Sequence, residues 1–406
     1  MNEQLEYDII ILGGGMVGTA LACALGNSDL RIALLDQQKP NLDWPIDGFD
    51  MRVSALTYAS QKLLTHIGAW QYMQQRRVSP FTDMHVWDAT GTGEINFRSE
   101  DVGTPHLGHI VENRVTLGAL FDRLNQLENI DYIQPVKACD VNFDDNAVKL
   151  QLDGQQTINA KLIVGADGAR SWLRNQANIQ INTYDYHQKG VVTTVMTQHL
   201  HKNTARQRFL PTGPLAFLPL TDGYCSIVWS TTTEEADKLV NLNEADFIQA
   251  LENALGESEL GKIESIAARG AFPLRKQHAE TYCKHRMVLV GDAAHAIHPL
   301  AGQGVNLGLL DIATLAEEII QAHNKNRDFG RLQALRHYER RRKVDNTLML
   351  NSMDGFHLLF ANDNKALSGL RNFGLSLTNR ITPVKSKLIE HAMGMDRNIP
   401  LINFPQ

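Results

Sequence analysis

The stretch YDIIILGGGMVGTALACALG, residues 7–26, decides the fold of this 406-residue chain. A short apolar run rich in isoleucine is followed by Gly13, Gly15 and Gly18 at G-x-G-x-x-G spacing, and then by a segment that favours a helix. A strand, a tight turn and a helix in this order predict a Rossmann-like unit that binds a dinucleotide. The N–H groups at the start of the helix would face the negatively charged pyrophosphate.

Each glycine of this turn has a physical role in the prediction. Gly13 permits the sharp turn, Gly15 lets the pyrophosphate approach the main chain, and Gly18 lets the helix pack closely on the strand. The predicted cofactor-binding residues of the turn are Gly13, Gly14, Gly15, Met16, Val17 and Gly18. The alternative is a glycine-rich turn without a ligand.

A carboxylate follows the next predicted strand, RIALLD, which ends at Asp36, eighteen positions after Gly18. At this place a carboxylate can accept hydrogen bonds from both hydroxyls of an adenosine ribose, and it would repel the extra phosphate of NADP. Asp36 is therefore a predicted cofactor ligand. The motif alone does not separate FAD from NAD.

Two later segments separate the two cofactors. KLIVGADGARSWLR (161–174) is typical of a buried strand ending before Asp167, and RMVLVGDAAHAIHPLAGQGVNLGLLD (286–311) of a strand ending at Gly291 and Asp292. Asp167, Gly291 and Asp292 are predicted cofactor-binding residues, and Asp292 can accept hydrogen bonds from the ribityl hydroxyls of a flavin. The turn that follows offers N–H groups at a helix N-terminus, suited to the negative charge of a reduced flavin ring. Its predicted cofactor-binding residues are Gly302, Gln303, Gly304, Val305 and Asn306. An NAD enzyme needs no such second site, so the sequence favours FAD.

These three motifs, in this order and at these separations, resemble those of the class A flavoprotein monooxygenases, which have the fold of para-hydroxybenzoate hydroxylase. The string GDAAHAIHPLAGQGVNLG is long and specific. The strings SWLR after the middle motif, LAFLPL (215–220) and HLGHIVEN (106–113), with the C-terminal tail, further resemble the ubiquinone-biosynthesis branch of that family. The resemblance extends over nearly the whole chain.

The resemblance implies further flavin-binding residues. Arg52, in MRVSAL, matches an arginine associated with the flavin. Arg114 opens a helix where relatives place a residue near the pyrophosphate or the ring, and Pro299 lies in the loop after Asp292. For each arginine, a surface ion pair is the alternative. Asp36 departs from the family pattern, in which glutamate is more common.

The resemblance also implies the chemistry. NADH or NADPH reduces FAD, O2 adds to the flavin as a hydroperoxide, and one oxygen atom is transferred to an aromatic ring carbon. The implied substrate is a polyprenyl phenol or benzoquinol of ubiquinone biosynthesis. No residue is assigned as a catalytic acid or base, since the ring oxygen of the substrate itself activates the ring.

Three alternatives to this function stay open. A prenyl reductase and a halogenase share the fold, although the WxWxIP motif of halogenases is missing from this sequence. The third alternative is a non-catalytic assembly protein of a multi-enzyme quinone-biosynthesis complex.

The three motifs are far apart in sequence, so one site must be assembled from distant segments. We expect an α/β fold with a discontinuous Rossmann-like FAD-binding domain, an inserted antiparallel-sheet substrate domain and a helical C-terminal region. The FAD-binding domain takes residues 1–75, 105–182 and 275–345, the substrate domain 76–104 and 183–274, and the C-terminal region 346–406. The patterns VVTTVMTQ and YCSIVWST predict strands of the inserted sheet, and EADFIQALENALG, residues 244–256, predicts a helix beside it.

Composition excludes several other classes of protein. The formal net charge of −6 argues against nucleic-acid binding, and four widely spaced cysteines offer neither a disulfide framework nor a zinc site. Such cysteines favour a reducing, cytoplasmic setting. Residues 9–25 carry no charge, but acidic residues precede them and the run is too short to cross a membrane. His295 and His298 are too few for a catalytic zinc site and are expected to pack around their loop.

The C-terminal tail is basic although the whole chain is acidic. Residues 336–387 hold ten Lys and Arg against four Asp and Glu, and Leu367, Leu370, Phe373 and Leu377 recur at helical spacing. A basic amphipathic helix can lie on an anionic bilayer, here the inner face of the membrane, or dock against a partner. The alternative is a helix that caps the core and exposes a solvated basic face.

Overall fold

A parallel sheet at the centre of the molecule contains the strands of all three motifs. The computed structural model describes residues 5–44, 48–296, 304–360 and 382–394. Five strands of this six-stranded sheet run parallel, and the edge strand β20 runs antiparallel. In spatial order the strands are β20 (Cys283–Lys284), β21 (Met287–Leu289), β13 (Leu162–Gly165), β2 (Ile9–Leu12), β3 (Ile32–Leu35) and β9 (Ile130–Ile133). The motif strands β2, β13 and β21 are therefore neighbours, and the predicted Rossmann-like α/β fold is confirmed.

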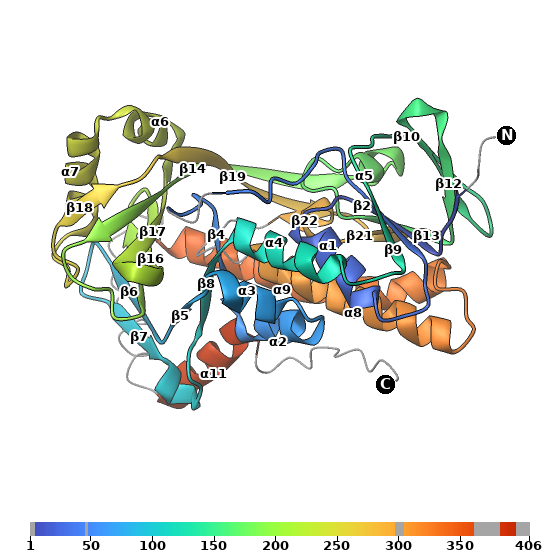
Figure 1. Cartoon of the computed structure of the whole chain (residues 1–406). Coiled ribbons are helices and arrows are strands. Elements are labelled where there is room, and N and C mark those ends of the chain that lie inside the picture. The colour runs from blue at the N-terminus through green and yellow to red at the C-terminus, as the bar shows by residue number, and fades with distance from the viewer. Residues whose placement is uncertain (1–4, 45–47, 297–303, 361–381, 395–406) are drawn as a thin grey trace.

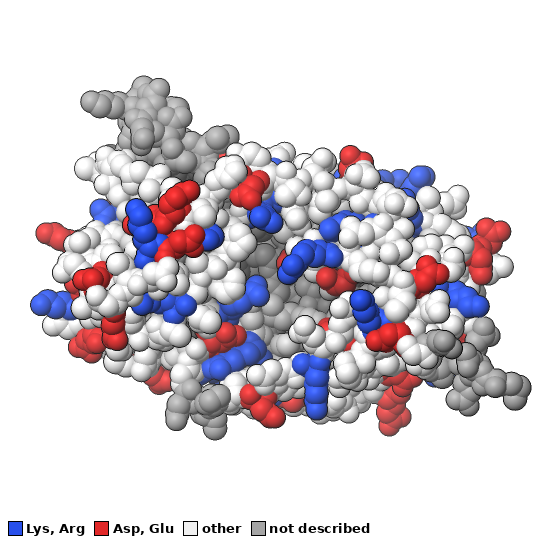
Figure 2. Space-filling view, turned by 90° about the horizontal axis from the view of Figure 1, so that it is seen from above, with Lys and Arg blue, Asp and Glu red and all other residues white. Residues whose placement is uncertain are grey.

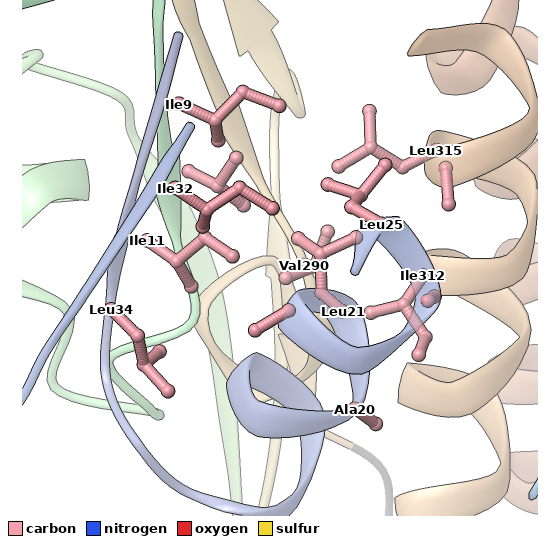
Figure 3. Close-up of a cluster of buried hydrophobic side chains, with 14 of the residues drawn as sticks. Ile9, Ile11, Ala20, Leu21, Leu25, Ile32, Leu34, Val290, Ile312 and Leu315 are labelled. Atoms are coloured by element: carbon pink, nitrogen blue, oxygen red, sulfur yellow. The ribbon is translucent and has the colours of Figure 1, made fainter. Parts of the chain in front are cut away.

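The hydrophobic core lies between this sheet and the helices that follow its strands. Helix α1 (Met16–Leu25) packs against α8 (Gly304–Asn324) and α4 (Asn113–Leu124). Both faces of the sheet are covered, so its strands are continuous apolar runs rather than alternating ones. Figure 3 shows fully buried side chains from three sources, namely Ile9, Ile11, Ile32 and Leu34 from the strands, Leu21 and Leu25 from α1, and Ile312 and Leu315 from α8.

A nine-stranded sheet forms the second lobe and corresponds to the predicted antiparallel insertion. Its strands pair antiparallel, except that β15 and β6 run parallel. In spatial order they are β22 (His295–Ala296), β19 (Gly270–Ala279), β14 (Ile181–Thr197), β17 (Tyr224–Thr232), β16 (Gly213–Pro219), β15 (Thr204–Leu210), β6 (Asp83–Asp88) and β7 (Glu94–Arg98), with β18 (Ile263–Ile266) also paired to β14. Figure 1 shows β14 and β19 reaching from this lobe across the top of the molecule.

The two faces of the large sheet differ in what they contact. Helices α6 (Thr233–Asn241) and α7 (Glu244–Leu255) cover one face, where Leu215 and Phe217 of β16 are buried against them. The alternate residues Ala216 and Leu218 join an apolar cluster on the other face with Ile110 of the neighbouring small sheet. The period-2 alternation along β16 thus sends one set of side chains to the helices and the other toward the cofactor-binding unit.

Smaller elements complete the fold. The described ones are the sheet of β4 (Val53–Thr57), β8 (Gly108–Glu112) and β5 (Ser79–Phe81), the sheet of β1 (Leu5–Glu6), β12 (Thr157–Ala160), β11 (Val148–Leu152) and β10 (Ala138–Phe143), the helices α2 (Tyr58–His66), α3 (Trp70–Arg76), α5 (Trp172–Gln176), α9 (Leu332–Phe360) and α11 (Thr382–Met393), and the 3-10 turns η1 (Ser99–Val102), η2 (Asp153–Gln155), η3 (Thr221–Gly223) and η4 (Gly291–Ala293).

The C-terminal helices that the structure describes pack on the body of the protein. Helix α9 continues past residue 345, and its Tyr338, Asn346 and Leu350 are all buried. On α11, Ile389 and Met393 are buried beside Leu107. The apolar pattern predicted at 367–377 lies outside the described residues. Within the described ranges, no helix is both long and apolar enough to cross a membrane.

We predict that the core around α1 supplies a large share of the stability. Replacing Leu21, which is fully buried, with alanine removes its contacts with the strands and α8. The Leu21→Ala variant should lose about 3 kcal/mol of unfolding free energy, measured by urea denaturation. The matched control is Leu200→Ala, since Leu200 is 71% exposed, and it should change stability by less than about 0.5 kcal/mol. Equal losses in the two variants would contradict this view of the core.

Candidate functional site

Three turns meet at one edge of the central sheet. In the parallel register, Leu12 at the end of β2 pairs with Gly165 at the end of β13, which pairs with Leu289 of β21. Because the three strands end level with one another, the turns that follow them lie side by side. The carboxyl edge of a parallel sheet is where ligands of such folds bind.

The first turn presents an open helix N-terminus. Gly13 has a φ of +105°, and a Cβ on this residue would lie 2.4 Å from the carbonyl oxygen of Ala166, so only glycine fits there. A Cβ on Gly18 would lie 1.9 Å from the carbonyl oxygen of Gly13. Gly15 differs, because no atom of the described residues beyond its two chain neighbours lies within 4 Å of its Cβ position. Gly15 caps α1 without a side-chain hydrogen bond, so the N–H groups of the first turn are open to an anion.

Asp36 holds this turn and also faces the same space. Its carboxylate accepts hydrogen bonds from the main-chain N–H of Gly14 (2.6 Å) and of Gln38 (2.8 Å). Two acceptor positions of the carboxylate are thereby used, and the remaining lone pairs are available to a ribose. The aspartate therefore positions the glycine turn in addition to the ligand role predicted from the sequence.

Tyr132 is a candidate ligand that sequence reasoning missed. It lies on β9, and its hydroxyl is buried near Gly14 with no hydrogen-bond partner among the described residues. Burial, together with the nearby charge of Asp36, raises the pKa of Tyr132 to about 12, so the phenol stays a neutral donor. Its sequence context, IDYI, is that of an ordinary strand and carries no signal. An unpaired buried hydroxyl here suits the adenosine end of a dinucleotide.

The second turn is bonded to the third by a buried arginine. Asp167 accepts a hydrogen bond from the N–H of Leu173 (3.1 Å) at the start of α5. Arg174, only 4% exposed, donates to the carbonyl oxygen of Ala293 in the third turn (2.9 Å) and to that of Ala169 in its own (2.8 Å). The sequence placed Arg174 in the motif but gave no sign of this contact.

Asp292 is an exposed residue of the third turn, at the carboxyl edge of the central sheet. The residue is exposed, yet protein atoms surround it so closely that desolvation raises the pKa of its carboxyl, with His295 and Arg52 opposing the shift. Arg52 is also exposed, and its guanidinium lies 5.7 Å from the ring centroid of Phe272 on the large sheet. The space-filling view shows the molecule hollowed between its two lobes, with basic side chains along the rim (Figure 2).

Arg114 is held in an ion pair rather than directed at the turns. It bonds to Glu112 (2.7 Å), which is 2% exposed, and donates to the carbonyl oxygen of Gly48 (2.8 Å). Arg77 makes the same two contacts, each at 2.8 Å. Glu112, the acidic partner of both arginines, is buried, whereas the alternative considered from the sequence was a surface ion pair. Through their bonds to Gly48, the two arginines also fix the segment that precedes Arg52.

The predicted flavin-ring loop is described only from Gly304 onward. Pro299, Gly302 and Gln303 lie outside the described residues, as does His298. The side chain of Asn306 is bonded within the protein, because its amide oxygen accepts from Ser60 Oγ (2.6 Å) and its amide nitrogen donates to the carbonyl oxygen of Ala55 (2.8 Å). Asn306 would therefore serve a ligand mainly through its main-chain N–H. His295 packs within its turn and bonds to Asp311 on α8 (2.5 Å), as expected of a histidine that supports the loop.

These residues together fit an extended dinucleotide. The open N-terminus of α1 suits a pyrophosphate, Asp36 and Tyr132 suit an adenosine, and Asp292 lies across the sheet edge from them. NAD would leave the Asp292 side without a role, whereas the polyhydroxyl chain of FAD matches a carboxylate there. The donor set therefore fits FAD.

The glycine turn supplies a matched pair of variants. Gly15→Ala adds a methyl group where no protein atom is near, so the fold should keep its melting temperature while FAD affinity falls about tenfold or more through crowding of the pyrophosphate. Gly18→Ala places its methyl against the carbonyl of Gly13 and should lower the melting temperature itself. Calorimetry and FAD titration check both. A Gly15→Ala protein with unchanged FAD affinity would show that the cofactor does not bind at this turn.

Comparisons with known proteins show the family of the chain. The chain matches the family model described as FAD binding domain over residues 6–351. It is 36% identical to ubiquinone hydroxylase UbiL of Rhodospirillum rubrum, over 95% of this chain and 89% of that protein. It is 35% identical to 3-demethoxyubiquinol 3-hydroxylase of Escherichia coli (strain K12), over 97% and 100% of the two chains. The identity is 32% with ubiquinone biosynthesis monooxygenase COQ6 of Dictyostelium discoideum, over 97% and 92%.

Solved structures share the fold at lower identity. The p-nitrophenol 4-monooxygenase PnpA of Pseudomonas putida DLL-E4 superposes with a TM-score of 0.80 at 17% identity, covering 98% of this chain and 100% of that one. PqsL of Pseudomonas aeruginosa, described as a probable FAD-dependent monooxygenase, gives 0.77 at 19% identity, covering 91% and 99%. The chain belongs to the FAD binding domain family and, within it, to the flavoprotein hydroxylases of the ubiquinone-biosynthesis branch.

Proposed function

We propose that this protein is an NAD(P)H- and O2-dependent monooxygenase that hydroxylates the aromatic ring of a polyprenyl phenol or benzoquinol in ubiquinone biosynthesis. The observation that carries the proposal is the convergence of the open glycine turn, Asp36 and Asp292 at one sheet edge. Nearly full-length relatives whose names state ubiquinone hydroxylation support the choice of substrate. The Rossmann-like unit, the large sheet and the C-terminal helices would then be the FAD-binding domain, the substrate domain and the tail predicted from the sequence.

In this proposal the protein holds the cofactor and excludes water. The α1 N-terminus binds the pyrophosphate, Asp36 and Tyr132 bind the adenosine, and Asp292 binds the ribityl chain. The N–H groups at the start of α8, at Gly304 and Val305, place the positive end of a helix dipole where the ring carries negative charge. FAD, when bound, supplies the electron transfer and oxygen activation, with NADH or NADPH as the donor.

The substrate would lie against the apolar face of the large sheet. Ala216 and Leu218 on that face pack with Tyr224 and with Val53 of β4, close to Arg52. An apolar wall suits a prenylated ring and limits the access of water to the reacting atoms. The ring oxygen of the substrate activates the ring carbon, so the protein's task is to orient the ring and keep the site dry.

Product mass tests this function against its rivals. Purified protein should be yellow, and with NADH or NADPH, a prenyl phenol and labelled O2 it should form a product heavier by one oxygen atom from O2. Asp292→Ala should lose both bound FAD and product, because the carboxylate that faces the cofactor is gone. A product with two added hydrogens would instead indicate a prenyl reductase. A colourless protein that takes up no added FAD would contradict the flavoenzyme assignment and leave the assembly protein.

The natural substrate can be identified in the host. Deleting the gene should cause one ubiquinone precursor to accumulate, and mass spectrometry of that precursor gives the ring position that this enzyme hydroxylates. Restoring the gene with Asp292→Ala should not relieve the accumulation, whereas a purely structural assembly role would be restored by a stable Asp292→Ala protein.

We also propose that the basic tail brings the enzyme to the cytoplasmic, inner face of the membrane, where the hydrophobic substrate would reside. The enzyme would act there either alone or as part of a quinone-biosynthesis complex. Truncation at residue 345 cannot test this, because α9 would lose its buried Asn346 and Leu350. Reversing the charge of basic residues in the tail tests the proposal without removing these buried residues. Each basic residue near an anionic surface contributes about 1 kcal/mol to binding.

The tail proposal predicts a selective loss of membrane binding. Lys365→Glu, Arg371→Glu and Arg380→Glu together should weaken binding to anionic vesicles on the order of 100-fold at low salt. The control reverses Lys39, Lys149 and Lys325, which are exposed and lie outside the tail, and produces the same change in net charge. Vesicle co-sedimentation measures both. Equal binding by the two triple variants would reject the role of the tail.

A further inference from the structure

A buried carboxylate lies directly beneath the turn that carries Asp292. Asp311, on α8, is completely buried, as is Asn346, and its other partners His295 and Arg342 are 2% and 3% exposed. We call these four residues the Asp311 network. They come from the third turn, α8 and α9, so the network joins three separate segments.

Every acceptor position of Asp311 is directed at a specific donor. One carboxylate oxygen accepts from the main-chain N–H of Gly291 (3.1 Å) and from His295 Nε2 (2.5 Å). The other oxygen accepts from Arg342 Nε (2.8 Å) and from Asn346 Nδ2 (3.2 Å). The network therefore has one side bonded to the cofactor turn and the other bonded to α9.

Asp311 is ionised in this setting. Burial alone would raise its pKa, but the hydrogen bonds and charges of His295 and Arg342 outweigh burial and lower the pKa to about 2. Arg342 is satisfied elsewhere as well, by Asp345 (2.9 Å) and by the amide oxygen of Asn346 (2.8 Å). The turn thus contacts the negative charge of Asp311, which is neutralised by the positive charge of Arg342 on its other side.

A buried ion pair is a poor way to gain stability, because desolvating both ions offsets most of their attraction. An apolar side chain of similar volume at position 311 would serve packing as well. What an apolar side chain could not do is accept from both ends of the turn between Gly291 and His295. The hydrogen bonds of Asp311 are therefore explained by a role in positioning this turn.

The turn has a backbone conformation that favours glycine. Gly291 has a φ of +58°, and the next residue is the exposed Asp292. Asp311 holds the N–H of Gly291, while Arg174 holds the carbonyl of Ala293 from the other side. The residues on both sides of Asp292 are therefore held by hydrogen bonds to buried side chains.

We propose that Asp311 is a positioning residue for the flavin, acting through Gly291 and His295 to fix Asp292 against the cofactor. This inference rests on the proposed function only in that FAD binds at this turn. Loss of these hydrogen bonds should loosen Asp292 and alter the electrostatic environment of the flavin, with effects on affinity and on reduction potential.

The test uses the full-length holoenzyme and reads the flavin itself. Asp311→Asn removes the charge, and it also deprives Arg342 of its buried carboxylate partner, which can cost folding. His295→Leu is the second variant, since it removes one of the two bonds between Asp311 and the turn while keeping the pair of Asp311 and Arg342. His295→Gln keeps a side-chain N–H donor at this position and should rescue part of the effect.

A matched control lies at the opposite end of β21. Arg286, 1% exposed, bonds to Asp328 (2.6 Å) just before that strand begins, whereas Gly291 follows the other end of the strand. Asp328→Asn breaks an arginine–aspartate pair beside the start of this strand and changes no hydrogen bond of the turn. It should lower the melting temperature without altering the flavin.

Asp311→Asn and His295→Leu should each raise the FAD dissociation constant about tenfold or more, and should shift the reduction potential of the flavin that remains bound. Asp328→Asn should change neither. Unchanged flavin affinity and potential in His295→Leu, or equal changes in the control, would overturn the inference. A wild-type protein that binds FAD but hydroxylates no phenol would contradict the proposed function alone, because these readouts need no substrate.

Discussion

The main-chain hydrogen bonds that pair β2 with β13 and β13 with β21 determine the geometry of the site. Each net bond contributes only about 1 kcal/mol, but together these bonds hold the three strands in one parallel register. In this register Leu12, Gly165 and Leu289 end level. Three turns separated by well over a hundred residues therefore reach one ligand, and the hydrophobic core is what keeps them there.

Buried polar side chains hold the three turns in the positions that the sheet gives them. Arg174 joins the second turn to the third, Asp311 supports the third from α8, and Glu112 fixes the segment before Arg52 through two arginines. Each of these groups is buried and would be costly if left unpaired. Buried hydrogen bonds of this kind hold the turns in position, so less ordering would remain to be done when the cofactor binds.

Local pattern predicted most of the fold and the main-chain part of the site. The strands β2, β13 and β21, the helix α7 and the glycine turn follow from periodicity and spacing, because these depend on neighbours in sequence. The side-chain part was not predictable in the same way. Tyr132 reaches the turn only because β9 pairs with β3, Asn306 is used by Ser60 and Ala55, and Arg114 is paired with Glu112. Those contacts arise from tertiary packing, of which a single sequence carries no local signal.

The same turn that carries Asp292 also begins the connection to the substrate lobe. Only three residues after Asp292, β22 pairs with β19, with His295 opposite His278. Strand β19 continues into the large sheet, and together with β14 it is tied to α9, where Asp354 accepts from Tyr186 (2.6 Å) and pairs with Lys276. The floor that would hold the flavin and the wall that would hold the aromatic ring are thus parts of one hydrogen-bonded unit. Because a shift of the large sheet would pull on β22, the separation of the proposed substrate and cofactor sites would be set by the backbone rather than by the docking of two independent domains.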